Sequence, residues 1–175
     1  MSDTSPHESA NGGSPLPEAL RITSPTPLVD IGANLTHESF DRDLEATLTR
    51  ATEANVTTLV ITGADLEDAT KAAKLATRFA GLHATAGLHP HHAADWTPEL
   101  EQAMLELHRQ EVVVAVGECG LDYNRDFSPR PDQLRALEEQ LAIAVETRLP
   151  VFLHEREASD TLINVLRDYR DQLSG

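Results

Sequence analysis

The chain has 175 residues, 40% of them hydrophobic, which is enough for one globular domain with a hydrophobic core. Its 14 basic and 29 acidic residues give a formal net charge of −15, which argues against a protein that coats DNA or RNA with its general surface. A small pocket that binds divalent cations is compatible with this charge, because bound ions can reverse the local potential.

The cysteine content and the hydropathy indicate the compartment. A single cysteine, Cys119, excludes an intrachain disulfide, and no apolar stretch is long enough to span a bilayer. We therefore expect a cytoplasmic protein that contacts no membrane, and no obligate protein partner is evident. Residues 1–27 are rich in Ser, Pro, Gly and acidic residues and lack the charged and apolar regions of a secretory signal, so we expect a disordered tail there and one domain over residues 28–175.

From residue 28 onward, short apolar runs alternate with longer amphipathic stretches, which predicts five βα units around a parallel sheet. The runs are mostly β-branched or aliphatic, as in strands buried on both faces. Strands are predicted over residues 28–32, 57–62, 83–87, 112–116 and 149–153. Helices are predicted over residues 41–53 and 66–80, from 98, from 131, and over 160–173.

Polar residues stand at the carboxyl ends of these strands, where the loops of parallel βα folds converge on one mouth and functional groups gather. They are, in chain order, Asp30 and Asn34, Thr62 and Gly63, His89 and His91, Glu118 and Asp122, and His154. This placement predicts a single site at that mouth.

Glu118 and His154 are the strongest candidates for metal ligands. Each follows an apolar run, where a carboxylate needs a cation or a donor. Ligation by one carboxylate oxygen and one imidazole nitrogen suits Zn²⁺ or Mn²⁺ and, with more oxygens, Mg²⁺. The alternative is an ion pair of Glu118 with Arg125 or Arg156 and a hydrogen-bonded core histidine at 154; the occurrence of both at consecutive strand ends favours the metal site.

The other candidates have weaker patterns. The segment 87–92 concentrates three histidines; we expect His89 and His91 to contact substrate and His92 to be solvated. Asp30 binds a second ion or helps activate water, or alternatively caps the following loop. Asp122 has the same two interpretations, and Arg156 is a candidate phosphate contact because a guanidinium can bind two oxygens.

Four sequence blocks together resemble the TatD family of metal-dependent deoxyribonucleases. They are DIGANL at residues 30–35, TAGLHPH at 85–91, GECGLDY at 117–123 and PVFLHER at 150–156. Their order and spacing are also similar to those of the family, over nearly all of residues 28–156.

The resemblance implies an α/β fold, a TIM-type (β/α)8 barrel of the amidohydrolase-like class. It also implies hydrolysis of DNA phosphodiester bonds, from an end of single strands, with a divalent metal that is most often Mg²⁺. Glu118 would match the family's metal-binding glutamate, and His154 its metal ligand in the His-x-Arg motif that Arg156 completes. His89 and His91 would match the Gly-x-His-Pro-His loop at the site.

The sequence departs from the family pattern in two ways. Many members carry His-x-His after the first strand, where this chain has Gly32 and Asn34, which favours magnesium over zinc. Members also place a histidine after the sixth strand and an aspartate after the eighth. Because the 175 residues supply about five βα units, we expect a truncated barrel with two open sheet edges that needs completion to be stable and active.

Two other functions stay open at this point. The chain is alternatively a non-catalytic remnant or an interaction module that keeps the βα surface. It is alternatively a hydrolase of another ester or of an amide, because one barrel scaffold hosts many reactions.

Overall fold

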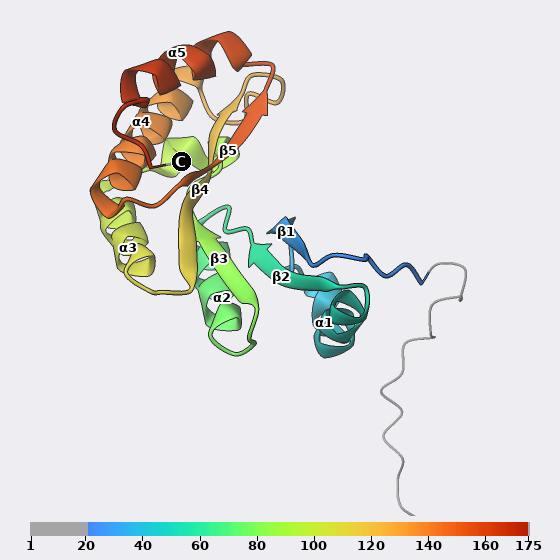
Figure 1. The fold of residues 1–175 in the computed structure, drawn as a ribbon. Coiled ribbons are helices and arrows are strands. Elements are labelled where there is room, and N and C mark those ends of the chain that lie inside the picture. The colour runs from blue at the N-terminus through green and yellow to red at the C-terminus, as the bar shows by residue number, and fades with distance from the viewer. Residues whose placement is uncertain (1–20, 175) are drawn as a thin grey trace, which may run out of the picture.

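The structure is a computed structural model that describes residues 21–174. In this part of the chain five parallel strands form one curled sheet in the order β1-β2-β3-β4-β5, with a helix following each strand (Figure 1). The strands are β1 (Leu28–Ala33), β2 (Val56–Ile61), β3 (Leu82–Ala86), β4 (Val113–Asp122) and β5 (Val151–Arg156). The α-helices are α1 (Leu44–Glu53), α2 (Leu66–Ala76), α3 (Pro98–His108), α4 (Arg130–Thr147) and α5 (Ser159–Tyr169), and the 3-10 helices are η2 (Glu38–Phe40) and η3 (Pro90–Asp95).

This architecture confirms the predicted βα order and is that of a truncated TIM-type barrel. Side chains at helix starts fix where helices begin: Asp65 accepts a hydrogen bond from Asp68 N at 2.8 Å at the start of α2, and Thr97 accepts one from Leu100 N at 3.2 Å at the start of α3. The helices pack against the strands beside them, α2 on β3 and α4 on β4, along one side of the curled sheet (Figure 1).

The core lies between this sheet and its helices, in three clusters of buried apolar side chains. One joins β2 and β3 to α2 and α3, a second joins η3 and β4 to α4, and a third joins β4 and β5 to α4 and α5. The second and third clusters hold the strands that carry the candidate site, so these strands are fixed from the helix side.

Two strands run well past their predicted ends, and β1 ends one residue later than predicted. β4 continues to Asp122 and β5 to Arg156, because their residues stay paired as far as the register Asp122↔Arg156. Two glycines within β4 hid this continuation, since glycine weakens a strand pattern. As a result Glu118 and His154 lie inside strands rather than directly after them.

Strand β1 differs from the expectation that the strands are buried on both faces. Five of its six residues are exposed, and the exposed fractions of Val29 and Ile31 are 58% and 61%. Among the described residues β1 pairs with β2 alone and β5 with β4 alone, so both are edge strands. The apolar run of β1 therefore has no second layer over it here, as expected for an open sheet.

Of the predicted tail, residues 1–20 lie outside the described part of the chain, and residues 21–27 carry no helix or strand. Ser24 N donates to Ala54 O at 3.0 Å, and Thr23 Oγ1 donates to Glu53 O at 3.1 Å. The domain boundary at residue 27 stays a prediction. No helix within residues 21–174 is long and apolar enough to cross a membrane, and the cytoplasmic location also stays a prediction.

Buried His108 at the end of α3 makes the stability depend on pH. Its Nε2 lies 2.9 Å from Ala86 O, and its Nδ1 is buried without a hydrogen-bond partner. Burial lowers the pKa of His108, although the hydrogen bond to Ala86 O opposes this. In the unfolded chain the histidine has its usual pKa of about 6.5, whereas in the folded chain its pKa is lower. The unfolded state therefore binds more protons below about pH 6.5, and the free energy of unfolding should fall as the pH drops below that value.

The variant His108→Gln, whose amide can still donate to Ala86 O, should show a weaker loss of stability between about pH 7 and pH 5. Urea unfolding at a series of pH values measures the two slopes. His89 contributes to the slope of the free energy of unfolding against pH in both proteins, so the difference between the two slopes reports His108. Equal slopes in the two proteins would contradict a role of His108 in this pH dependence.

Candidate metal and substrate site

Three consecutive strand units bring the strongest candidates together. His89 follows β3 and begins η3, Glu118 lies in β4, and His154 lies in β5. One ligand atom from each of these side chains lies within 4.8 Å of the other two. All three are at most partly accessible, and the sheet order makes β3, β4 and β5 direct neighbours. The cluster therefore forms between neighbouring units of the sheet.

A bulge in β4 sets the position of Glu118. The register of β4 against β5 shifts between Val116 and Cys119, so Gly117 and Glu118 form an irregular step in the ladder. Gly117 has φ +135°, and a Cβ there would lie 2.1 Å from the carbonyl oxygen of Phe152. Only glycine fits this backbone, and the step holds the Glu118 carboxylate next to β5.

His154 lies between two carboxylates. Its Nδ1 is 3.1 Å from Glu118 Oε1, and its Nε2 is 3.4 Å from Asp122 Oδ2. The Nε2 atom is buried and makes no hydrogen bond of good geometry. A cation held by Glu118 would use the Nδ1 lone pair and leave the proton on Nε2, facing Asp122. This is the arrangement in which a second carboxylate orients a metal-binding imidazole.

Asp122 is fully buried and ionised. Its Oδ2 accepts from His91 Nε2 at 2.8 Å, and its Oδ1 accepts from the backbone N–H groups of Asn124 at 3.1 Å and Arg125 at 2.8 Å. Burial raises the pKa of Asp122, but the hydrogen bonds from Arg125 N, the His91 ring and Asn124 N together outweigh it and hold the pKa at about 2. Asp122 is thus a fixed negative group behind both histidines.

The hydrogen bonds of His89 give it a different role from His154. Its Nδ1 accepts from His91 N at 3.2 Å, as the cap of η3. Burial, then repulsion by His154 and the neighbouring histidines, lowers the pKa of His89 to about 3, so the ring is neutral near pH 7. The single proton of a neutral imidazole must then lie on Nε2, which is 3.9 Å from Glu118 Oε1. His89 therefore offers the cluster an Nε2–H donor and has no free nitrogen lone pair with which to bind a cation.

The remaining predicted residues lie at different distances from this cluster. His91 is bound to Asp122, and its ring centroid is 4.2 Å from that of His89. Arg156 ends β5 with an exposed side chain that pairs with no carboxylate among residues 21–174. Asp30 is exposed on β1, separated from β4 by β2 and β3, and accepts from Gly32 N at 3.0 Å, as in the loop-capping interpretation. Its carboxylate is not among the three groups of the cluster.

The ion-pair interpretation of Glu118 does not hold within the described residues. The charged neighbours of its carboxylate are His154 and His89, and neither Arg125 nor Arg156 is within ion-pair distance. A carboxylate with two imidazole neighbours and no arginine keeps its oxygens available to a cation.

Two buried glutamines on α4 hold the strand ends in place, and the sequence reasoning missed both. Gln133 accepts from Asp122 N at 2.8 Å and donates to Asp122 O, and Gln140 accepts from Leu88 N at 2.7 Å and donates to Leu88 O. Each fixes the backbone beside a site residue. Their spacing of seven residues, along the same face as buried Leu137, was the available signal.

We expect Gln140→Leu to lower the free energy of unfolding by about 2–3 kcal/mol, because it leaves the N–H and C=O of Leu88 buried without partners. Urea denaturation measures this. The matched control is Gln102→Leu on the exposed face of α3, where the lost bond to Glu106 is solvated and the change should stay within about 0.5 kcal/mol. Equal effects of the two substitutions would show that Gln140 does not clamp this loop.

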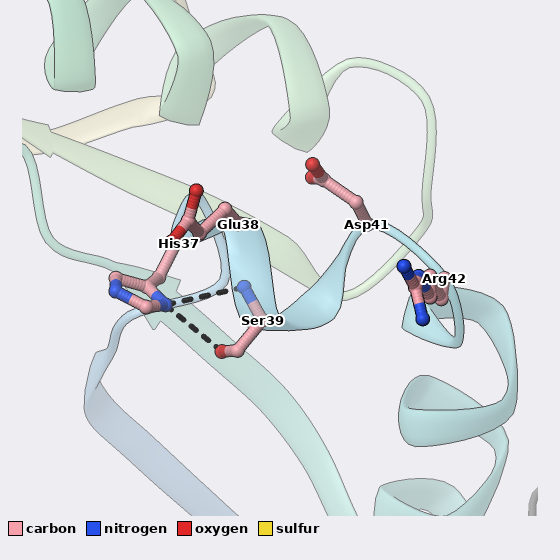
Figure 2. A pocket seen from close by; sticks show the side chains of 5 residues that line it. All are labelled: His37, Glu38, Ser39, Asp41 and Arg42. Atoms are coloured by element: carbon pink, nitrogen blue, oxygen red, sulfur yellow. Dashed lines mark hydrogen bonds between the residues drawn. The ribbon is translucent and has the colours of Figure 1, made fainter.

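A surface hollow follows β1, at the connection to α1 (Figure 2). It is lined by His37, Glu38, Ser39, Asp41 and Arg42. His37 Nδ1 accepts from Ser39 N at 3.2 Å and lies 2.9 Å from Ser39 Oγ, so the ring caps η2. Charges of both signs line the hollow, and none of its residues belongs to the cluster.

The chain matches the family model for TatD related DNases over residues 29–175. It is 45% identical over 148 residues to the 3′-5′ ssDNA/RNA exonuclease TatD of Citrobacter koseri, an alignment that covers 85% of this chain and 57% of that protein. It is 42% identical to the protein of the same name from Escherichia coli K12, with the same coverage.

Among solved structures, the chain is similar to YjjV, a TatD homologue from Escherichia coli K12, with a TM-score of 0.76 and 31% sequence identity. The match covers 81% of this chain and 55% of that one. The chain spans a little more than half the length of the relatives it matches.

Proposed function

The chain belongs to the TatD related DNase family, and from this premise we propose that it is a metal-dependent hydrolase that cleaves phosphodiester bonds of single-stranded DNA, removing nucleotides from an end. The observation that carries the proposal is the approach of His154 Nδ1 to Glu118 Oε1 at 3.1 Å, in a cluster without arginine. The relatives' names include RNA, so ribonucleotide strands belong in the test as well.

The donor set fits a divalent cation. Glu118 offers carboxylate oxygens, His154 offers the Nδ1 lone pair, and the buried, otherwise unsatisfied Nε2 of His154 faces Asp122. We propose Mg²⁺, because Gly32 and Asn34 supply no imidazole where zinc-type members have two. When bound, the ion supplies an activated water and polarises a phosphoryl oxygen.

The other side chains act on the substrate in this proposal. His89, neutral and protonated on Nε2, donates a hydrogen bond to a phosphate oxygen, and His91, whose ring is oriented by the bond from its Nε2 to Asp122, contacts the substrate beside it. Arg156 neutralises phosphate charge from the end of β5. Asp30 is proposed to help activate water or to bind a second ion from β1, outside the three-residue cluster.

The test uses the polypeptide at its natural length and end-labelled single-stranded and duplex oligonucleotides, with Mg²⁺ and with a chelator. We expect the single strand to shorten progressively from one end, only with metal, and the duplex to react more slowly. A protein that binds the metal and leaves all strands intact would defeat the proposal. If the protein hydrolysed another ester or an amide instead, it would be the alternative hydrolase. If it turned over no substrate, it would be the non-catalytic module.

A further inference from the structure

Phe127, in the loop between β4 and α4, is an exposed aromatic residue beside the candidate site. Its exposed fraction is 66%, and it is the one aromatic among the large apolar side chains that are exposed within the described residues. Its ring centroid lies 4.7 Å from that of His91 with an interplanar angle of 64°. His91 in turn contacts His89 and Asp122, so one ring separates Phe127 from the residues that we propose to bind phosphate and to orient the metal ligand.

The backbone around Phe127 is held in place although its side chain is solvated. Ser128, which follows it, is buried; its hydroxyl donates to His91 O at 2.9 Å and accepts from Ala94 N at 3.1 Å. Gln133 Nε2 donates to Ser128 O at 2.9 Å. A loop anchored in this way presents the ring at low entropic cost, as a binding surface requires.

Within the described residues, the loop that carries this ring holds one paired carboxylate and one unpaired guanidinium, because Asp126 lies 2.7 Å from Arg130. Arg125, whose backbone N–H is bound to Asp122, has an exposed side chain with no ion pair among the described residues, and so does Arg156 at the end of β5. In a chain of net charge −15, an unpaired guanidinium two residues before an exposed aromatic ring suits a polyanion that carries flat apolar groups, and Arg156 opposite Asp122 adds a second positive charge at the end of β5.

We propose that Phe127 is the platform on which a base of the single-stranded nucleic acid stacks, next to the phosphate at the cluster. The inference rests on the proposed function and specifies how its substrate is held. Every base has a π-face, so the contact tolerates all sequences, and it discriminates against a duplex, whose internal base faces are covered by stacking.

The experiment compares wild type, Phe127→Ala and Phe127→Trp at natural length with Mg²⁺, on a short oligodeoxythymidylate and on the same strand with an abasic end. We expect Phe127→Ala to raise KM about tenfold with kcat changed less than about threefold, and Phe127→Trp to restore KM. On the abasic strand the wild type should already show the raised KM, with no further effect of Phe127→Ala. The control Ile163→Ala, which removes another exposed apolar side chain, on α5, should match wild type.

An unchanged KM for Phe127→Ala would overturn the inference, as would an equal loss on the abasic strand or a lowered melting temperature, which would indicate a structural role. If the wild type cleaves no strand, the proposed function fails instead. Fluorescence anisotropy of the labelled oligonucleotide then decides the stacking: Phe127→Ala must weaken binding about tenfold, and equal affinities would overturn it.

Discussion

Replacement of Glu118 by glutamine is expected to lower the proposed metal-dependent hydrolysis of single-stranded DNA by about 1,000-fold or more in the polypeptide at its natural length. Glutamine keeps the size of the side chain but removes its negative charge. The Nδ1 atom of His154, 3.1 Å away, then faces a neutral amide that no longer attracts a cation. Glu118→Ala should abolish turnover in the same way.

Two measurements separate this effect from a folding defect. Calorimetric titration with Mg²⁺ or Mn²⁺ should show weakened binding by Glu118→Gln, while its melting temperature without metal stays close to that of the wild type. The matched control is Glu111→Gln, an identical charge change at an exposed position before β4, at the opposite end of the strand. Unchanged turnover in Glu118→Gln would remove this residue from the site.

The second large effect is expected for stability, at Gly120 in β4. Gly120 has φ +147°, which L side chains rarely adopt, and a Cβ there would lie 1.9 Å from the carbonyl oxygen of His154. The alanine variant must therefore push β4 and β5 apart where they carry the site. We expect Gly120→Ala to lower the free energy of unfolding by about 3 kcal/mol or more, measured by urea denaturation.

Gly32→Ala is the control for this substitution. Gly32 lies on the edge strand β1 without a positive φ, and its added Cβ would meet only Phe152 Cζ at 3.8 Å, an ordinary contact. Its effect should stay within about 0.5 kcal/mol. If the two alanine variants were equally stable, the close approach of β4 and β5 at Gly120 would not be a property of the folded protein.

Hydropathy alternation was sufficient to predict the order of the βα units, because each strand is a short apolar run between helices. The predicted first residues of the strands lie within two residues of those observed. It was not sufficient for the length of β4, because Gly117 and Gly120 interrupt the apolar pattern. Both positions require glycine because they have a positive φ and lie against carbonyl oxygens of β5, which the sequence of β4 does not show. β1 was expected to be buried because its residues are apolar, whereas burial depends on what packs over the strand.

The sequence predicted which residues form the candidate site but not the role of each residue in it. The rule that functional groups gather at strand ends selected Glu118, His154 and His89, which the structure brings together. It could not show that His89 Nδ1 is occupied by a backbone N–H, which makes this ring a donor. Nor could it rank Asp122 above Asp30, because the sequence does not indicate which carboxylate is buried beneath the histidines and which is solvated.

The sequential sheet order has a consequence for how the chain folds during synthesis. Every strand after β1 pairs with the strand that precedes it in the sequence, so each βα unit can dock once it has emerged from the ribosome, without waiting for a distant segment. The side chains at positions 89 and 118 can be in place before β5 has emerged. His154 emerges last, so the pair of Glu118 and His154 that we propose to hold the cation is complete only then, and from that point a bound cation would stabilise the nascent chain.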